Sequence, residues 1–302
     1  MHADMVAPGF ERIHSPDSPP DRIYTGIRFG EGPVWNSREG SLYWVDIAED
    51  TIWKWTPGLG PERFIRPSGK ANGLTFDRQG RLVAAGWSSR NVWRLERDGS
   101  KVTLATQCNG KKLTAPNDIV VKSDGAIYFT ETTAAMTTPG FCFPGMDVQR
   151  YNDYLGVYRI SPDGSTVSLV VEDMPNPNGL AFSPDESLLY VNDTRDRIIR
   201  AFDVKPDGSL ANGRLFYTAV GDERGAPDGM KVDVEGNVYC TGPGGLHVVD
   251  PRGKLLGRLR TPSGHATNLC FGGPDWRWLF WTTFTTVFRV RLNISGMPVV
   301  IE

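Results

Sequence analysis

The sequence has little that would commit it to a membrane or to nucleic acid. No run approaches the roughly 18 consecutive apolar residues that a membrane helix needs, and the start, MHADMVAPGF, lacks a basic region followed by a long apolar stretch. Lys and Arg (33) nearly balance Asp and Glu (35), so there is no basic field to attract phosphate backbones or anionic membranes. We therefore expect a cytoplasmic protein that binds neither nucleic acid nor membrane.

Cysteine motifs and long helical patterns are also lacking. The four cysteines, Cys108, Cys142, Cys240 and Cys270, form no C-x-x-C pair, which argues against zinc ribbons and redox motifs. We interpret each as a small buried residue. Because long helical periodicity is absent, a TIM barrel or a doubly wound sheet is excluded.

What the chain does have is one pattern repeated six times: a small turn, an alternating apolar run, a polar Asp/Gly turn and a second apolar run. The copies start at Gly32, Gly73, Asp118, Gly179, Gly229 and Leu269. Most of these starts are separated by the roughly 40–50 residues typical of propeller blades. Further alternating segments lie between the copies, giving three or four strands per repeat. The sequence therefore predicts one all-β domain over residues 1–302, a six-bladed β-propeller with four-stranded antiparallel blades around a central channel.

Ring closure in such a propeller commonly uses a strand from one end of the chain. We expect the N-terminal segment, residues 1–28, to take part, with Phe10–Ile13 and Ile23–Phe29 as candidates. Met297–Ile301 is a third candidate. The sequence leaves the choice between them open.

The residue just before each first strand carries a side-chain oxygen in all six copies. Since first strands line the channel of a propeller, these six residues should meet at one mouth. They are Glu31, Asn72, Asn117, Asn178, Asp228 and Asn268. Asn and Asp also favour tight turns, but turn chemistry equally allows Ser, Thr or Gly, and none of these occurs here. A sulfur-free ring of oxygens with a formal charge of −2 suits one hard divalent cation, with Ca²⁺ the first choice and Mn²⁺, Zn²⁺ or Mg²⁺ as alternatives.

Five longer motifs make the chain similar to a known family. They are GEGPVW at 30–35, APNDIVVKSDGAIYFTE at 115–131, PNPNGLAFSPDESLLYVND at 175–193, APDGMKVDVEGNVY at 226–239 and TNLCFGGPD at 267–275. With them the chain resembles the gluconolactonase family, which includes regucalcin (senescence marker protein 30) and is related to diisopropylfluorophosphatase-type propellers. The resemblance covers almost the whole chain.

The resemblance implies a metal-dependent lactonase, a carboxylic ester hydrolase that acts chiefly on aldonolactones. The implied metal ligands are Glu31, Asn117, Asn178 and Asp228, which leaves Asn72 and Asn268 as supporting or substrate contacts. In this chemistry the metal polarises the lactone carbonyl and stabilises the oxyanion. Asp228 is the candidate general base or proton shuttle, and Glu31 is a less favoured one.

Several departures from the family pattern concern the substrate. Relatives commonly place an acidic residue and a His where this chain has Trp87 and its neighbours, and F-T-D-P-P where it has Glu131 in F-T-E-T-T. Animal members carry an Arg at the position of Ala115. His265, three residues before Asn268, is a further candidate at the channel mouth. The residues proposed to contact substrate are Asn72, Trp87, Ala115, Glu131, Met146, His265 and Asn268. Trp87 and Phe284 are either pocket walls or packing between blades.

An inserted loop over residues 132–155 accounts for the longest spacing between copies. It contains Met136, Phe141, Phe143, Met146 and Tyr151, so we hypothesise an apolar lid over the pocket. In that case the lactone would be less hydroxylated than a hexonolactone. The alternative is that the loop packs on a neighbouring blade.

Two other functions stay open from the sequence. Related propellers hydrolyse phosphoesters or phosphofluoridates with the same metal ligands. A non-enzymatic calcium-binding or protein-interaction propeller is the second alternative, since SLYWVDI at 41–47 weakly resembles the YWTD repeats of receptor propellers. A lactone is the expected partner, and the oligomeric state is not predicted.

Overall fold

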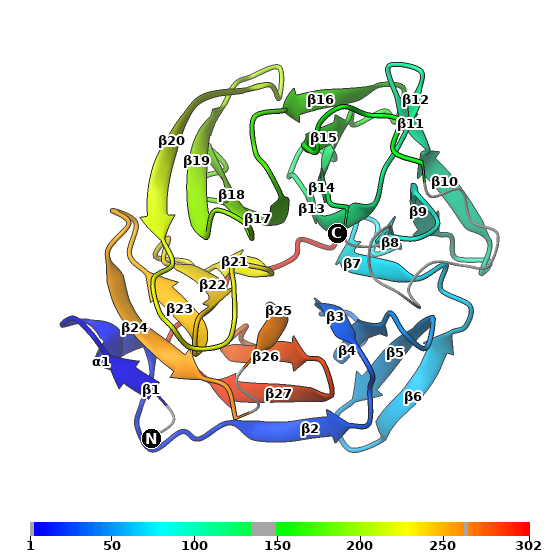
Figure 1. Cartoon of the computed structure of the whole chain (residues 1–302). Coiled ribbons are helices and arrows are strands. Elements are labelled where there is room, and N and C mark those ends of the chain that lie inside the picture. Colours follow the sequence, from blue (N-terminus) through cyan, green and yellow to red (C-terminus); the bar gives the residue numbers. More distant parts are fainter. Residues whose placement is uncertain (1–2, 134–148, 263–264) are drawn as a thin grey trace.

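The computed structural model describes residues 3–133, 149–262 and 265–302, and it shows a ring of six antiparallel blades around a central channel (Figure 1). This confirms the predicted six-bladed propeller. In each blade the first strand in the chain is the innermost one. The first three blades contain β3 (Gly30–Asn36), β4 (Ser41–Asp46), β5 (Thr51–Thr56) and β6 (Gly60–Ile65); β7 (Ala71–Phe76), β8 (Leu82–Gly86), β9 (Asn91–Leu95) and β10 (Lys101–Ala105); and β13 (Pro116–Val121), β14 (Ile127–Glu131), β15 (Val157–Ile160) and β16 (Val167–Val171).

The other three blades follow the same order. They contain β17 (Pro177–Phe182), β18 (Leu188–Asp193), β19 (Ile198–Val204) and β20 (Leu210–Thr218); β21 (Met230–Val232), β22 (Val238–Gly242), β23 (Gly245–Val249) and β24 (Leu255–Arg260); and β25 (Ala266–Gly272), β26 (Trp278–Thr283) and β27 (Thr286–Arg291) with β2 (Asp21–Thr25). The short strand β1 (Ala3–Met5) adds a fifth strand to blade 5. A small hairpin, β11 (Gln107–Cys108) with β12 (Lys111–Lys112), lies between blades 2 and 3 in the chain.

The ring is closed by the N-terminal strand β2, which pairs with β27 and completes blade 6. Of the three segments considered from the sequence, this one overlaps Ile23–Phe29. Phe10–Ile13 forms the short helix α1 (Phe10–Ile13), whose Phe10 and Ile13 pack against the outer part of blades 5 and 6. Met297–Ile301 belongs to no strand.

The C-terminal residues 297–302, called here the strap, instead cross the channel at the mouth where the inner strands end (Figure 1). At one end the Met297 N–H donates to the carbonyl of Val232 in blade 5 (2.9 Å). At the other end the Glu302 N–H donates to the carbonyl of Arg78 in blade 2 (2.7 Å), and the two side chains form an ion pair. Since blades 2 and 5 are three places apart in a ring of six, the strap connects opposite sides of the propeller.

The core consists of apolar clusters that each join two neighbouring blades. Along β4, Leu42 and Trp44 pack towards blade 6, whereas Tyr43 and Val45 pack towards blade 2. This follows from the period of two in a strand, which sends successive side chains to opposite faces. The same arrangement recurs between every adjacent pair of blades in the described residues, so burial extends around the whole ring.

Other expectations concern cysteines, charge and the inserted loop. Cys108, Cys240 and Cys270 are buried and free, as expected, whereas Cys142 lies outside the described residues.

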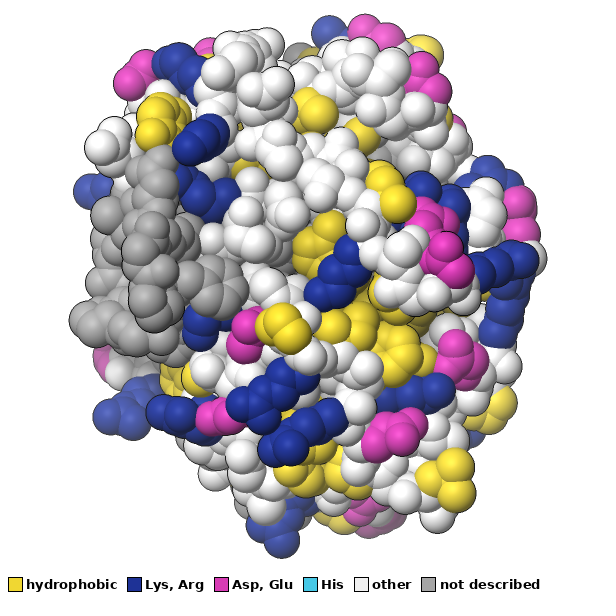
Figure 2. Space-filling model, turned by 90° about the vertical axis from the view of Figure 1, so that its right-hand side faces the viewer, with side chains coloured by type: hydrophobic (Ala, Val, Ile, Leu, Met, Phe, Trp, Pro, Cys, Tyr) yellow, Lys and Arg dark blue, Asp and Glu magenta, His cyan; other side chains and the backbone are white. Residues whose placement is uncertain are grey.

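Lys and Arg side chains lie beside Asp and Glu side chains across the face in Figure 2. No helix in the described part of the chain is long and apolar enough to span a membrane. Residues 134–148, with Met146 and most of the proposed lid, are outside the described ranges.

Candidate metal centre

The six oxygen-bearing residues stand at the start of the inner strands, where the strands share one irregularity. In five blades the pairing of the first two strands shifts register at this point, as between Glu31 and Val34 and between Pro116 and Ile119. A bulge of this kind re-aims a side chain. In blade 5 the residue Asp228 comes two positions before the strand. The structure thus brings all six together at one mouth of the channel; we call them the oxygen ring.

Glycine after a ring residue lets neighbouring blades approach closely. Gly32, which follows Glu31, has φ +50°, and a Cβ there would lie 2.0 Å from the carbonyl oxygen of Asn72. Gly179, which follows Asn178, would place a Cβ 2.0 Å from the carbonyl oxygen of Asp228. Any larger residue would push the next blade's ring residue away. The N-G and E-G steps therefore set the diameter of the ring.

Hydrogen bonds connect the side chains of the ring to each other. The Asn72 amide donates to Asn117 Oδ1 (2.6 Å), and the Asn117 amide donates to Asn178 Oδ1. Asn178 in turn is hydrogen-bonded to the Asp228 carboxyl group. On the other side of the ring, Asn268 is hydrogen-bonded to the Glu31 carboxyl group. The amides are therefore held with defined orientations, as ligands of a bound ion would need to be.

A layer of threonines supports the ring from behind. Thr194 Oγ1 accepts from the Asn178 amide (3.0 Å) and donates to the Pro227 carbonyl (2.7 Å). Thr130 Oγ1 donates to the Asn178 carbonyl (2.6 Å). Sequence reasoning missed these residues, although their place at or just past the ends of second strands, in F-T-E and N-D-T, was a usable signal.

Three carboxyl groups lie close together at this mouth: those of Glu31 and Asp118 are buried, and that of Asp228 is half-buried. Glu31 and Asp118 are each 2% exposed, and burial raises the pKa of Glu31 to about 8. Burial, and then the charges of Glu31 and Asp118, raise the pKa of Asp228 well above its usual range. The ammonium of Lys231 lies 3.8 Å from Asp118. One lysine leaves this region short of positive charge, an arrangement that favours a cation.

The donor set fits a hard divalent ion. Asn72 Oδ1 and Asp118 Oδ2 are buried and accept no hydrogen bond from the described residues, although buried oxygens normally have partners. Within the described ranges, no group of three or more His, Cys, Asp or Glu side chains could hold a metal, so a cation here depends on the amide oxygens. Amide and carboxylate oxygens are ligands that Ca²⁺ accepts.

Four aromatic rings from three blades form a row beside the oxygen ring. Trp87 meets Phe29 edge-on (6.4 Å between centroids), Phe29 contacts Phe284 (4.9 Å), and Phe284 stacks on His265 (4.8 Å). Each lies at the same edge of its blade as the residues of the oxygen ring. In blade 2, for example, Gly86, the residue before Trp87, pairs with Ala71, the residue before Asn72. Burial lowers the pKa of His265, which favours a neutral imidazole in the row.

The aromatic row joins three residues singled out from the sequence, and it adds Phe29, which was missed. Phe29 directly precedes the Gly-Glu step of the first motif. Phe284 is 44% exposed, whereas Trp87 is 2% exposed, so the row runs from the interior to the surface. Such a wall suits the flat face of a small ring.

Two of the proposed substrate contacts are fully buried. Ala115 and Glu131 are each 0% exposed, and Glu131 accepts a hydrogen bond from the backbone of Thr114. Burial raises the pKa of Glu131 to about 7. This placement favours a supporting role behind Asn117 over direct contact with substrate. Asn72 and Asn268 belong to the oxygen ring itself.

Comparisons with known proteins agree with this geometry. The family model described as SMP-30/Gluconolactonase/LRE-like region matches residues 29–285. The gluconolactonase of Zymomonas mobilis is 30% identical, over 96% of this chain and 86% of its own length. Pentonolactonase XacC of Haloferax volcanii is 29% identical (86% and 83%), and regucalcin of Oryctolagus cuniculus is 31% identical (84% and 82%). The solved structure of a gluconolactonase from Xanthomonas campestris superposes with a TM-score of 0.89 at 31% identity, covering 97% of this chain and 95% of that one.

Proposed function

Because the chain belongs to the SMP-30/gluconolactonase/LRE-like family, we propose that it is a metal-dependent lactone hydrolase. The observation that carries this proposal is the oxygen ring, in which the carboxyl groups of Glu31 and Asp228 and oriented amides meet at one mouth of the channel. Two of the relatives are named as lactonases, which are carboxylic ester hydrolases.

The proposed cation is Ca²⁺, held by Glu31, Asn117, Asn178 and Asp228. The support is chemical: two carboxylates neutralise a divalent charge, and the amides add neutral oxygens without sulfur or imidazole. When bound, the cation would polarise the lactone carbonyl and stabilise the negative charge that develops on its oxygen. Asn72 and Asn268 would keep the neighbouring ligands oriented through their hydrogen bonds.

Asp228 is the proposed general base. Its carboxyl group is hydrogen-bonded to Asn178, and the Asn192 amide donates to its backbone carbonyl, which fixes its position. The Asp228 carboxylate would take a proton from water while the water oxygen adds to the lactone carbonyl carbon. The ring C–O bond then breaks, and the alkoxide oxygen takes the proton back, which yields the hydroxy acid. Glu31, hydrogen-bonded to Asn268 and the Gly32 N–H (3.1 Å), is the less favoured base.

The proposed substrate is a small lactone whose ring faces the aromatic row. The names of two relatives of this chain, a gluconolactonase and a pentonolactonase, support an aldonolactone as the first substrate to test. An aromatic wall contributes stacking that tolerates both hydroxylated and alkyl-substituted rings. The panel should therefore run from aldonolactones to alkyl-substituted lactones.

The test measures proton release on this panel, using chelated protein resupplied with Ca²⁺, Mn²⁺, Zn²⁺ or Mg²⁺. We expect metal-dependent opening of at least one lactone by the unmodified protein. Asp228→Asn should reduce turnover at least about 100-fold, as loss of a general base does. The matched control is Asp222→Asn, an exposed acid in the preceding loop, which should keep full activity.

Two results would contradict the proposal. Near-normal activity of Asp228→Asn would exclude its role as base. If no lactone opens with any metal although calorimetry detects tight ion binding, the lactonase proposal fails. Phosphoester hydrolysis or a calcium-stabilised binding propeller would then account for the site.

A further inference from the structure

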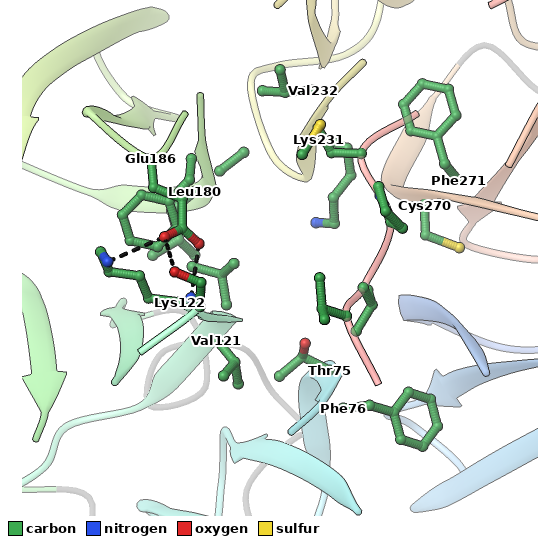
Figure 3. A pocket seen from close by; sticks show the side chains of 18 of the residues that line it. Thr75, Phe76, Val121, Lys122, Leu180, Glu186, Lys231, Val232, Cys270 and Phe271 are labelled. Atoms are coloured by element: carbon green, nitrogen blue, oxygen red, sulfur yellow. Dashed lines mark hydrogen bonds and ion pairs between the residues drawn. The ribbon is translucent and has the colours of Figure 1, made fainter. Parts of the chain in front are cut away.

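A cavity of about 410 Å³ (Figure 3) lies at the other end of the channel from the oxygen ring. The oxygen ring stands at the start of the inner strands, whereas this cavity is lined by their ends. In β7, for example, Asn72 belongs to the ring and Phe76 lines the cavity. Four residues of strand separate them by roughly 13 Å. The volume is in the range of small-molecule pockets, about 300–1,000 Å³.

The wall of the cavity is mostly aliphatic and aromatic. It is formed by side chains from several blades, among them Leu74, Phe76, Val121, Leu180, Phe182 and Val232. In Figure 3, Val121 and Leu180 lie on one side of the space and Val232 on the other. Apolar walls hold water poorly, because they offer it few hydrogen-bond partners. An apolar ligand would therefore gain from entering.

Lys231 provides a cationic group within this apolar space. Its side chain extends into the space between the opposing walls (Figure 3) and is 27% exposed. The ammonium donates to the Met230 carbonyl (2.8 Å). It also forms an ion pair with Asp118, at 3.8 Å, which is beyond hydrogen-bonding range. Because an ammonium has three donors, it can still donate to a ligand.

The two other cations that line the cavity are engaged at its rim. Lys122 pairs with Glu186 (3.1 Å) and Asp124 (3.4 Å). Arg78 pairs with Glu302 at the end of the strap and donates to the Ser123 carbonyl. These contacts fix the rim, so Lys231 is the best-placed cation for a ligand that enters the cavity.

The strap forms one wall of the same cavity. Met297 and Val299 line it and are half-buried, whereas Pro298 and Val300 are exposed. Since the strap is tied to Val232 at one end and to Arg78 at the other, the cavity has a built wall on this side. It is therefore enclosed by blades and strap together.

We propose that this cavity is a second ligand site, which binds a small aliphatic carboxylate. The aliphatic chain would lie against the apolar wall, and the carboxylate would accept a hydrogen bond from the Lys231 ammonium. The proposal does not depend on the lactonase activity, because none of the residues proposed to hold the cation, to act as base or to contact the lactone lines this cavity. Lys231 is near both places, through its ion pair with Asp118.

The test is calorimetric titration of the full chain with sodium decanoate, in EDTA and in Ca²⁺, below the micellar concentration. We expect saturable binding with one site in both conditions. Val121→Trp, which fills the cavity, should abolish it, whereas Val102→Trp on the exposed outer strand β10 should not. Circular dichroism melting would verify that each variant is folded.

Lys231→Met tests the contact to the ligand's carboxylate separately from the contacts to its aliphatic chain. It should weaken decanoate binding roughly ten-fold or more, since a charge-assisted hydrogen bond is lost, and leave decanol binding unchanged. Lys254→Met, an exposed lysine before β24 of the same blade, is the matched control. This comparison stands even if Val121→Trp does not fold.

Three outcomes would overturn the proposal. The first is absence of saturable decanoate binding. The second is binding that a folded Val121→Trp variant retains, which would place the ligand elsewhere. The third is an equal loss of decanoate and decanol binding in Lys231→Met, which would remove Lys231 as the carboxylate partner.

Discussion

Without its cation, the protein should lose stability as the pH rises from about 6.5 to 8. Burial raises the pKa of Glu31 to about 8 in the folded chain, whereas an unfolded glutamate titrates near 4.3. In this window the folded state therefore holds a proton that the unfolded state has lost, so each rise in pH favours unfolding. One such proton corresponds to about 1.4 kcal/mol per pH unit, or about 1.6 kcal/mol over the window, because the folded carboxyl group is half ionised at pH 8.

Other buried groups also titrate near this window. Burial raises the pKa of Glu131 to about 7, which adds a loss of stability in the same direction as Glu31. Burial lowers the pKa of His247 to about 4, so its opposite effect fades above about pH 6.5 and is complete by about pH 7.5, where the unfolded imidazole has lost its proton. The raised pKa of Asp228 acts in the same direction as Glu31. Bound Ca²⁺ should remove most of the slope, because both carboxyl groups are then ionised in the folded state as well.

The assay is urea unfolding followed by tryptophan fluorescence at three pH values, in EDTA and in saturating Ca²⁺. Glu31→Gln should flatten the slope in EDTA, since the substituted side chain does not titrate. A metal-free stability that rises with pH, or a slope that Glu31→Gln leaves intact, would refute the assignment of this proton to Glu31.

Three further variants test the ring, the aromatic row and the strap. Asn117→Ala removes an amide that bridges two others and should weaken Ca²⁺ binding by calorimetry at least about ten-fold, a loss of about 1.4 kcal/mol; an unchanged affinity would exclude it as a ligand. Phe29→Ala interrupts the row and should raise the KM for the best lactone severalfold with little change in kcat, whereas a loss confined to kcat would argue against a binding wall. Ile301 in the strap packs against the apolar cluster between blades 1 and 2, so Ile301→Ala should cost about 1 kcal/mol of unfolding free energy, and exposed Val300→Ala close to none; equal effects would mean that Ile301 is not packed there.

The fold and the oxygen ring were predictable because both depend on one repeating register. Every blade starts its inner strand at the same point of the pattern, so residues as distant as Glu31 and Asn268 could be assigned to one mouth. The bulges at these positions were not visible in the sequence, but they preserve the register that it suggested.

Features that join different blades without a shared register were not predictable. The aromatic row depends on how far loops from three blades lean towards each other, and Phe29 has no counterpart in the other repeats. In the sequence, Lys231 is an ordinary polar position of an alternating strand. The strap follows no periodicity that would place it across the channel. Ring closure had three candidates, and packing rather than pattern selects β2.

The pairing of β2 with β27 has a consequence for how the chain folds during synthesis. Asp21 pairs with Arg289, so the closing contact joins residues that are 268 positions apart in the chain. Until this contact forms, the face of blade 1 that carries Trp35, Leu42 and Trp44 is only partly covered, because Phe280 and Val287 of the same cluster belong to the last blade. Contacts this distant in sequence form slowly, and unpartnered apolar surface promotes aggregation. The nascent chain is therefore most vulnerable at blade 1, and this vulnerability ends only when the last blade has left the ribosome.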